Sequence, residues 1–322
     1  MVARAWDFNP KDLMQNDPPY TGFFDLQVNG FVGVDFQQPD IDHAAMTRAV
    51  DGLLAHRTDR ILFTLITDKI DSLCAKLANI EKFCAADPKI ARMVVGYHIE
   101  GPYMSPLPGF HGAHDPALMK APDTGEFEML QEAAKGKIRL ITIAPEQPNS
   151  PEFIKYITDR KVVASIGHSD ADDRQIDEAI AAGLSMCTHL GNGMPVQMHR
   201  HENIMQRLLA RDELYAAFIP DGIHIPGGVF QNYIRAKPRD KVIFTTDCMS
   251  AAGAGPGRFR IARFEVDVGA DGVVREPGKP NFAGSSLTMD AGVENIRKFL
   301  GWNEAEIHEA CSTRVATSLG LE

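Results

Sequence analysis

The stretch Met93-Val-Val-Gly-Tyr-His-Ile-Glu-Gly-Pro102 is a short apolar run that ends in polar residues, a glycine and a proline. Short runs rich in Val, Ile and Tyr and closed by Gly and Pro are typical of buried β-strands. We therefore expect a strand over Met93–Ile99, with polar side chains such as that of Glu100 at its carboxyl end. The rest of the chain repeats this pattern of an apolar run followed by polar residues.

Seven other segments have the same character. They are Phe23–Val28, Ile61–Thr67, Ile138–Ile143, Val162–Ile166, Ser185–Thr188, Tyr215–Ile219 and Val242–Thr246. Most are separated by stretches with the apolar spacing of amphipathic helices, for example Asp42–His56, Asp71–Ala85, Asp172–Ala182, Glu202–Leu209 and Val229–Ala236. Strands that alternate with helices indicate a parallel sheet. Eight such units in 322 residues predict a single α/β domain over 1–322, folded as a (β/α)8 TIM-type barrel.

An open doubly wound sheet is the alternative architecture. Its usual dinucleotide-binding form has no support, because no Gly-x-Gly-x-x-Gly follows the first strand. After the eighth strand, Arg260–Glu276 alternates in polarity and contains the turn pair Asp271-Gly272, which predicts a β-hairpin excursion. Final helices are expected over Met289–Leu300 and Glu304–Leu319.

Composition limits the classes of partner. The formal net charge of −10 argues against nucleic-acid and anionic-membrane partners, although a small anionic substrate needs only a local patch of donors. The first twenty residues lack a signal-peptide core, and no later segment has the length of a membrane span. Five scattered cysteines without a C-x-x-C pair favour a reducing compartment. We expect a soluble cytoplasmic protein.

Polar residues stand at the carboxyl ends of six of the eight expected strands. They include Gln27 and Asn29, Glu100, His168, His189 and Asn192, Asp221 and His224, and Asp247. In a barrel these strand ends meet at one face. A single strand-end histidine is more often structural, and a single Asp or Glu more often caps the next helix. Burying the polar side chains of six strand ends at one face without partners would cost free energy. A cation bound among them would compensate their charge and satisfy their lone pairs.

Three of these residues form a candidate ligand set for a metal ion. Glu100, His168 and His189 offer one carboxylate oxygen and two imidazole nitrogens, which suits one zinc ion with open positions for water and substrate. Asp247 can act as general base and then as general acid. His224 can donate a hydrogen bond to a carbonyl oxygen that gains charge. The pattern predicts a metal-dependent hydrolase.

The motifs resemble those of N-acetylglucosamine-6-phosphate deacetylases, a family of the amidohydrolase superfamily. The matching stretches are Gly22-Phe-Phe-Asp-Leu-Gln-Val-Asn-Gly30, His98-Ile-Glu-Gly-Pro102, Gly112-Ala-His-Asp-Pro116, Gly167-His-Ser169, Thr188-His-Leu-Gly-Asn-Gly-Met-Pro195, Asp221-Gly-Ile-His224, Thr246-Asp247 and Gly284-Ser-Ser-Leu-Thr-Met289. They occur in the family's order from about Thr21 to the C-terminus. The resemblance implies hydrolysis of the acetamido group of an N-acetylhexosamine 6-phosphate, with glucosamine as the leading sugar, and a homodimer.

The resemblance also implies roles for single residues. It assigns the metal to Glu100, His168 and His189, and catalysis to Asp247 and His224. It assigns substrate binding to His114, Asn192, Gly193, Arg200 and His224. His111 is the other histidine of its loop, but it does not align with the Gly-x-His motif. For Arg200 the alternative is a solvated loop charge, because the surrounding segment diverges from the family.

Three departures from the family refine these expectations. Gln27-x-Asn29 replaces the His-x-His of many amidohydrolases, and amides are poorer zinc ligands than imidazoles, so we expect a single ion. About twenty residues precede the first strand and the chain stops at Glu322, which predicts that the family's small β-sandwich domain is absent or vestigial. Gly191 and Gly193 stand where the family usually has an aromatic residue and an alanine, so the substrate pocket is expected to be wider.

Two other functions remain open at this point. One is a different amidohydrolase reaction, such as cyclic-amide hydrolysis or deamination of a heterocycle, although such relatives generally keep His-x-His. The other is a non-catalytic sugar-phosphate-binding protein on the same scaffold. Retention of the three ligand candidates together with Asp247 argues against a retired site.

Overall fold

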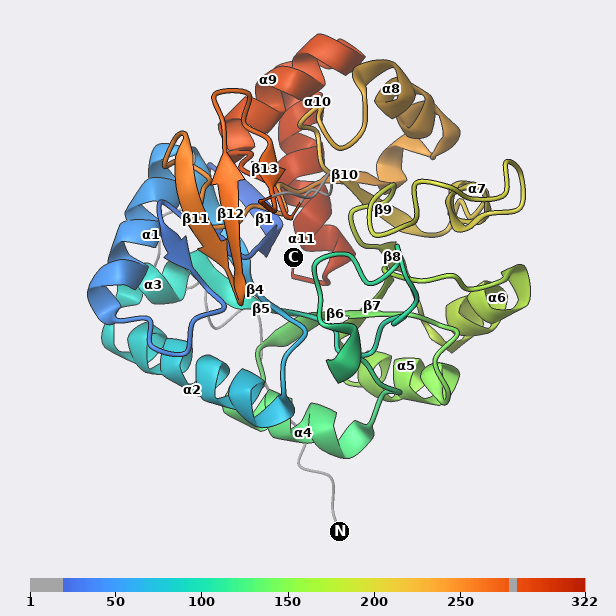
Figure 1. Cartoon of the computed structure of the whole chain (residues 1–322), viewed down its shortest axis with the longest axis horizontal. Helices are drawn as coiled ribbons and strands as arrows, with labels where there is room; N and C mark the ends of the chain where they lie inside the picture. Colours follow the sequence, from blue (N-terminus) through green and yellow to red (C-terminus); the bar gives the residue numbers. More distant parts are fainter. Residues whose placement is uncertain (1–19, 278–282, 322) are drawn as a thin grey trace.

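The computed structural model of the protein, described here for residues 20–277 and 283–321, contains a parallel sheet of eight strands that curls around a central axis (Figure 1). The strand order is β1-β4-β5-β6-β7-β8-β9-β10. Their bounds are Phe23–Val28 (β1), Thr58–Ile66 (β4), Val94–Glu100 (β5), Ile138–Ile143 (β6), Val163–Ile166 (β7), Met186–Cys187 (β8), Tyr215–Phe218 (β9) and Val242–Phe244 (β10). Neighbouring strands pair in parallel, so the predicted TIM-type barrel is confirmed.

Helices cover the outside of the sheet (Figure 1). They are α1 (His43–Ala55), α2 (Ile70–Ala86), α3 (Pro88–Met93), α4 (Thr124–Ala133), α5 (Ser150–Thr158), α6 (Asp173–Ala182), α7 (Ile204–Leu209), α8 (Gly227–Ala236), α9 (Met289–Leu300), α10 (Glu304–His308) and α11 (Arg314–Ser318), with a π-helical turn over Glu309–Thr313. The acids that open two predicted helices, Asp42 and Asp172, are N-caps whose side chains accept hydrogen bonds from backbone N–H groups. None of the described helices is long and apolar enough to cross a membrane.

Apolar side chains fill the interior of the barrel. One buried cluster takes residues from the strands, namely Phe24, Leu26, Leu62, Val95, Leu140, Met186, Ala217 and Ile243, and Val163 of β7 packs against it. Val315 of α11 belongs to the same cluster. A second and larger cluster lies between the strands and the surrounding helices. The barrel is therefore a packed core, and polar side chains gather at the carboxyl ends of the strands.

The first and last strands close the barrel through side chains as well as backbone. The main chain contributes a bridge between Val28 and Cys248, and Asn29 N donates to Cys248 O over 2.7 Å. The buried carboxylate of Asp25 accepts hydrogen bonds from Thr245 Oγ1 at 2.6 Å and Thr246 Oγ1 at 2.5 Å. Asp25 of β1 thus holds the segment that follows β10.

Replacing Asp25 with alanine is expected to lower the free energy of unfolding by about 2–4 kcal/mol, because two buried threonine hydroxyls lose their acceptor. Urea unfolding of metal-free protein measures the effect. Asp40→Ala removes an exposed carboxylate and is expected to stay within about 0.5 kcal/mol of the wild type. A loss at position 25 as small as that of the control would show that the carboxylate does not hold the barrel closed.

The excursion after β10 differs from the single hairpin expected over Arg260–Glu276. It is a three-stranded antiparallel sheet of β11 (Gly257–Ile261), β12 (Phe264–Val268) and β13 (Val274–Arg275). The Asp271-Gly272 turn is confirmed between β12 and β13. The first turn, at Ala262 and Arg263, was missed because Ala262 adopts φ +51°, which no glycine or asparagine signals.

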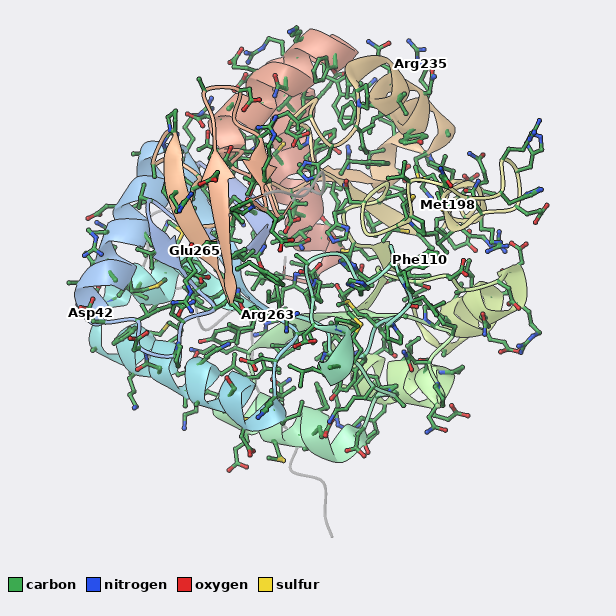
Figure 2. The ribbon with its side chains drawn as sticks, viewed as in Figure 1. Asp42, Phe110, Met198, Arg235, Arg263 and Glu265 are labelled. Carbon is green, nitrogen blue, oxygen red and sulfur yellow. The ribbon has the colours of Figure 1, made fainter. Side chains whose placement is uncertain are left out.

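The first turn is held from outside the excursion. Ala262 N donates to Asp35 Oδ2 over 2.8 Å, and Asp35 belongs to the short hairpin of β2 (Gly30–Phe31) and β3 (Val34–Asp35). Arg263, at the tip of the β11–β12 hairpin in Figure 2, pairs with Asp115 of the loop after β5. The excursion is therefore tied to two loops at the mouth of the barrel.

Candidate active site

Glu100, His168 and His189 meet at the mouth of the barrel. Glu100 ends β5, and the two histidines follow β7 and β8. Glu100 Oε1 lies 2.9 Å from His189 Nε2 and 3.4 Å from His168 Nε2, and the two nitrogens are 3.1 Å apart. All three side chains are buried, and their ligand atoms lie within 4.8 Å of one another. The structure thus brings together the three metal ligands predicted from the sequence.

The surroundings of His168 fix which nitrogen faces the cluster. Its Nδ1 lies 2.7 Å from Phe110 O, and a carbonyl oxygen can only accept a hydrogen bond. Nδ1 therefore donates to this carbonyl, and the bond fixes the ring so that Nε2 faces Glu100 and His189, the orientation that a metal-ligating imidazole requires. A Cβ at Gly112 or Gly193 would lie 2.9 or 2.8 Å from atoms of this ring, so glycine at both positions leaves room for it.

The donor set fits a divalent cation. Burial favours a protonated Glu100, but hydrogen bonds with His168 and His189 outweigh it and hold the pKa of Glu100 well below its usual range. The carboxylate is therefore charged in a buried site, where an unpaired charge is costly. One carboxylate oxygen and two imidazole nitrogens that converge in this way are the ligand types of catalytic zinc sites.

Asp247 lies at the same mouth, three residues after β10, in a left-handed conformation with φ +51°. Asn29 Nδ2 donates a hydrogen bond to Asp247 Oδ1 over 2.8 Å. Burial, and then the negative charge of Glu100, raise the pKa of Asp247 to about 7, against the opposing influence of His189. In this environment the carboxyl group can both take up and release a proton near neutral pH.

His224 follows β9 and is held by an acid of its own turn. His224 Nδ1 lies 2.5 Å from Asp221 Oδ2. The other oxygen of Asp221 accepts hydrogen bonds from the backbone N–H groups of Ile223 and His224 at 2.8 and 2.9 Å. Asp221 therefore fixes the orientation of the imidazole, a role that the Asp-Gly-Ile-His motif did not reveal before the fold was known.

A cavity of about 250 Å³ opens beside His224. It is lined by Asp221, Ile223, His224, Gly272, Val273, Val274, Gly284, Ser285, Ser286, Leu287, Thr288, Ala291 and Asn295. Sequence reasoning gave no role to Ser285 and Ser286, although the Gly284–Met289 stretch was noted as a motif. Their hydroxyl groups add hydrogen-bonding capacity next to a predicted catalytic histidine.

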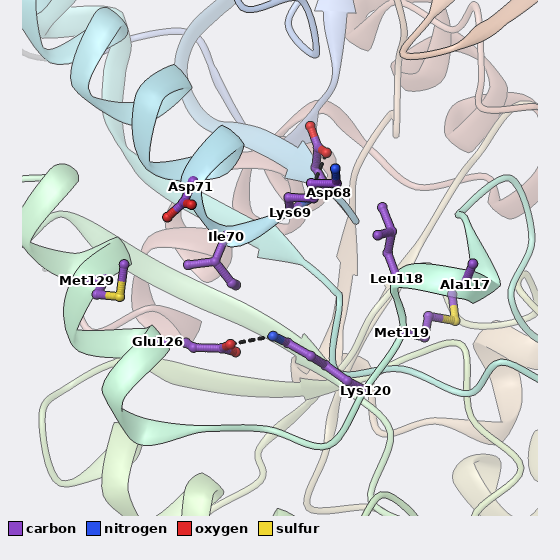
Figure 3. A pocket seen from close by; sticks show the side chains of 10 residues that line it. All are labelled: Asp68, Lys69, Ile70, Asp71, Ala117, Leu118, Met119, Lys120, Glu126 and Met129. Carbon is purple, nitrogen blue, oxygen red and sulfur yellow. Dashed lines mark hydrogen bonds and ion pairs between the residues drawn. The ribbon is translucent and has the colours of Figure 1, made fainter.

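A larger pocket, of about 460 Å³, lies beside α2 and α4 (Figure 3). None of the predicted catalytic or metal-binding residues lines it. Its Lys120 pairs with Glu126, and its Asp68 pairs with Lys76 at 2.7 Å. The charges in this pocket largely compensate one another, and the cavity beside His224 is the better candidate for substrate binding.

Of the other predicted substrate-binding residues, His114 and Asn192 lie against the three candidate metal ligands, whereas Arg200 lies on an exposed loop. His114 Nε2 lies 3.8 Å from Glu100 Oε2, and burial, followed by the nearby His168, lowers the pKa of His114 to about 3, so this imidazole is neutral. Asn192 Nδ2 donates to His189 O over 3.1 Å. Arg200 is exposed on the loop between β8 and α7 and forms no hydrogen bond or ion pair with the residues that the structure describes.

Glu146 supports the loop that carries His168. This half-buried carboxylate accepts hydrogen bonds from Ser169 Oγ at 2.6 Å and from Asp170 N at 2.7 Å, the two residues after the histidine. No sequence motif signals this role, because Glu146 follows β6 and contacts the loop after β7 only in the fold.

Replacing Glu146 with alanine is expected to weaken zinc binding about 10-fold, at the lower end of the range for groups that orient metal ligands. Competition with a chromophoric chelator measures the affinity. Glu146→Gln keeps one oxygen acceptor and is expected to lose less. Equal affinities for the wild type and the alanine variant would show that the loop holds His168 without this carboxylate.

The chain as a whole is similar to known proteins, in sequence and in fold. No protein-family model matches the chain. It is 30% identical to N-acetylglucosamine-6-phosphate deacetylase from Bacillus subtilis over 302 residues, which cover 93% of this chain and 75% of the relative. It is 32% identical to the Homo sapiens enzyme of the same name, covering 94% and 74%, and 31% identical to N-acetylgalactosamine-6-phosphate deacetylase from Escherichia coli O157:H7, covering 93% and 78%.

Solved structures give the same result. A mutant N-acetyl-D-glucosamine-6-phosphate deacetylase from Mycobacterium smegmatis, in complex with N-acetyl-D-glucosamine-6-phosphate, superimposes with a TM-score of 0.83 at 29% identity. The match covers 93% of this chain and 77% of that one. The enzyme from Thermotoga maritima superimposes with a TM-score of 0.82 at 27% identity, covering 93% and 78%.

Proposed function

Because this chain belongs to the N-acetylglucosamine-6-phosphate deacetylase family, we propose that it hydrolyses the acetamido group of an N-acetylhexosamine 6-phosphate to acetate and the amino sugar phosphate. N-acetylglucosamine 6-phosphate is the leading substrate, since most of the similar relatives are named for it. The buried convergence of Glu100, His168 and His189 at the mouth that also holds Asp247 is the observation that carries the proposal.

Glu100, His168 and His189 would hold one divalent ion, which we take to be zinc. When bound, such an ion supplies Lewis acidity, which makes water a better nucleophile near neutral pH and polarises the acetamido carbonyl. A single ion is favoured because Gln27 and Asn29 carry amides, and the Asn29 amide is already engaged with Asp247.

Asp247 moves the proton. Its ionised carboxylate removes a proton from the water that attacks the acetamido carbon, and a tetrahedral species forms. Asp247 then gives this proton to the amide nitrogen as the carbon–nitrogen bond breaks, so that acetate and the amine leave and the carboxylate is restored. His224, held by Asp221, donates a hydrogen bond to the carbonyl oxygen as negative charge develops there.

The other side chains bind the sugar phosphate. Neutral His114 contacts the substrate next to Glu100, and Asn192 and Gly193 offer donors beside the ligand histidines. Ser285 and Ser286 line the cavity next to His224, where their hydroxyl oxygens can accept hydrogen bonds from the sugar. Arg200 binds the phosphate, because a planar guanidinium group forms strong charge-assisted hydrogen bonds with phosphate oxygens.

Acetate release by zinc-loaded protein tests the reaction. The substrates are the 6-phosphates of N-acetylglucosamine, N-acetylgalactosamine and N-acetylmannosamine, together with the unphosphorylated sugars. We expect turnover on one phosphorylated sugar and its loss on chelation. Binding without acetate release would identify a non-catalytic sugar-phosphate-binding protein, and neither binding nor release with metal bound would overturn the assignment. The homodimer and the single-domain organisation stay predictions, and light scattering in solution would test the first.

A further inference from the structure

We propose that Asn29 is a positioning residue for Asp247, which it holds in the orientation needed for proton transfer. The inference rests on the proposed deacetylase function only in its kinetic consequences. The contact itself, between Asn29 Nδ2 and Asp247 Oδ1 at 2.8 Å, is a property of the fold. An amide binds zinc poorly, so Asn29 is not expected to be a metal ligand. Its contact with Asp247 gives it a different role.

The backbone of Asn29 is fixed on both sides of the side chain. Its N–H donates to Cys248 O, in the residue next to Asp247, over 2.7 Å. Its carbonyl oxygen accepts from Phe36 N over 3.0 Å, and the residue is only 2% exposed. The amide therefore starts from a rigid point that is hydrogen-bonded to the segment of the carboxylate it contacts. Removing the amide would leave Asp247 free to rotate within an otherwise unchanged frame.

The contact has two chemical consequences. It occupies Oδ1 of Asp247 and leaves Oδ2 as the oxygen available for proton transfer. It also favours the ionised carboxylate, because an N–H donor stabilises negative charge. The proton-accepting form of Asp247 needs such support, since burial opposes ionisation. A neutral amide gives that support without adding a second cation to the mouth of the barrel.

Two variants separate this role from a merely structural one. Asn29→Ala removes the donor and is expected to lower kcat about 10- to 100-fold, the range for a lost hydrogen bond to a charged group. It is expected to change KM little and to leave zinc affinity unchanged. The acidic limb of the kcat profile moves to higher pH, because the carboxylate loses a group that favours its ionised form.

Asn29→Asp keeps the volume but replaces the donor with a second carboxyl group. The two acids then compete for one proton, and the acidic limb moves further than in the alanine variant. Asn79→Ala is the matched control. It also removes an amide donor, from Asn79 Nδ2 to Ile41 O at 2.9 Å on the outside of the barrel, and is expected to leave kcat and its pH profile unchanged.

Wild-type turnover and the behaviour of these variants answer different questions. A wild type that releases no acetate overturns the proposed function, and the pKa of Asp247, followed by NMR of protein labelled with ¹³C at the aspartate carboxyl groups, then tests Asn29 alone. In either assay, the inference is overturned if the pH dependence of Asp247 is the same in Asn29→Ala as in the wild type. Zinc affinity that falls in parallel with activity would overturn it as well, since it would place Asn29 in support of the metal ligands.

Discussion

Replacing Asp247 with asparagine is expected to lower kcat about 10³- to 10⁴-fold while zinc and substrate still bind. The asparagine side chain has nearly the same shape, but it can neither accept the proton of the attacking water nor return one to the amine. General acid–base catalysis by one positioned group contributes up to about 10⁴-fold. Steady-state kinetics on the best acetamido sugar phosphate gives kcat, and calorimetry gives substrate affinity.

The control for this substitution is Asp40→Asn, which removes the same charge from an exposed position and is expected to leave kcat unchanged. A further check is the pH profile of the residual activity, which should lose the ionisation that belongs to Asp247. Turnover within 10-fold of the wild type would assign proton transfer to another group, and His224 would then be the first to examine.

Replacing His189 with alanine is expected to weaken zinc binding by about 100- to 1,000-fold and to abolish turnover at ordinary zinc concentrations. Zinc-finger peptides bind zinc through four ligands with apparent free energies of about 10–16 kcal/mol, which corresponds to roughly 2.5–4 kcal/mol for each ligand. His189 is the ligand nearest to Glu100, at 2.9 Å, so its loss removes a nitrogen and also leaves a buried carboxylate less well paired. Elemental analysis after dialysis against a weak chelator gives the stoichiometry.

His199→Ala is the matched control, because His199 is exposed on the loop before α7 and lies outside the group of residues that could hold a metal ion. It should retain the wild-type zinc content. A zinc content that is unchanged in His189→Ala would show that the ion is held elsewhere or by the remaining ligands alone. High zinc concentrations should partly restore turnover in the variant if its defect lies in affinity.

Local patterns in the sequence determined the barrel and the composition of its mouth. Short apolar runs predicted all eight strands, and two of them, Phe23–Val28 and Ile138–Ile143, have the predicted bounds. Strand ends were less well predicted. β4 begins at Thr58, three residues before the expected start, and β8 has only Met186–Cys187 in place of Ser185–Thr188. Pairing with neighbouring strands decides where a ladder ends, and sequence periodicity does not contain that information.

The sequence alone pointed to Glu100, His168 and His189 as candidate metal ligands, because parallel strands all place their carboxyl ends at one face of a barrel, and the fold brings the three together. Tertiary structure alone decided how these groups are supported. Asn29 and Asp247 are 218 residues apart, Asp25 and Thr245 are 220 apart, and Glu146 reaches Ser169 from a different strand end. Hydrogen bonds of this kind depend on where closure of the barrel places two distant backbones and on which rotamers packing permits. Candidate catalytic and metal-binding side chains can therefore be recognised in the sequence, whereas the contacts that orient them exist only in the fold.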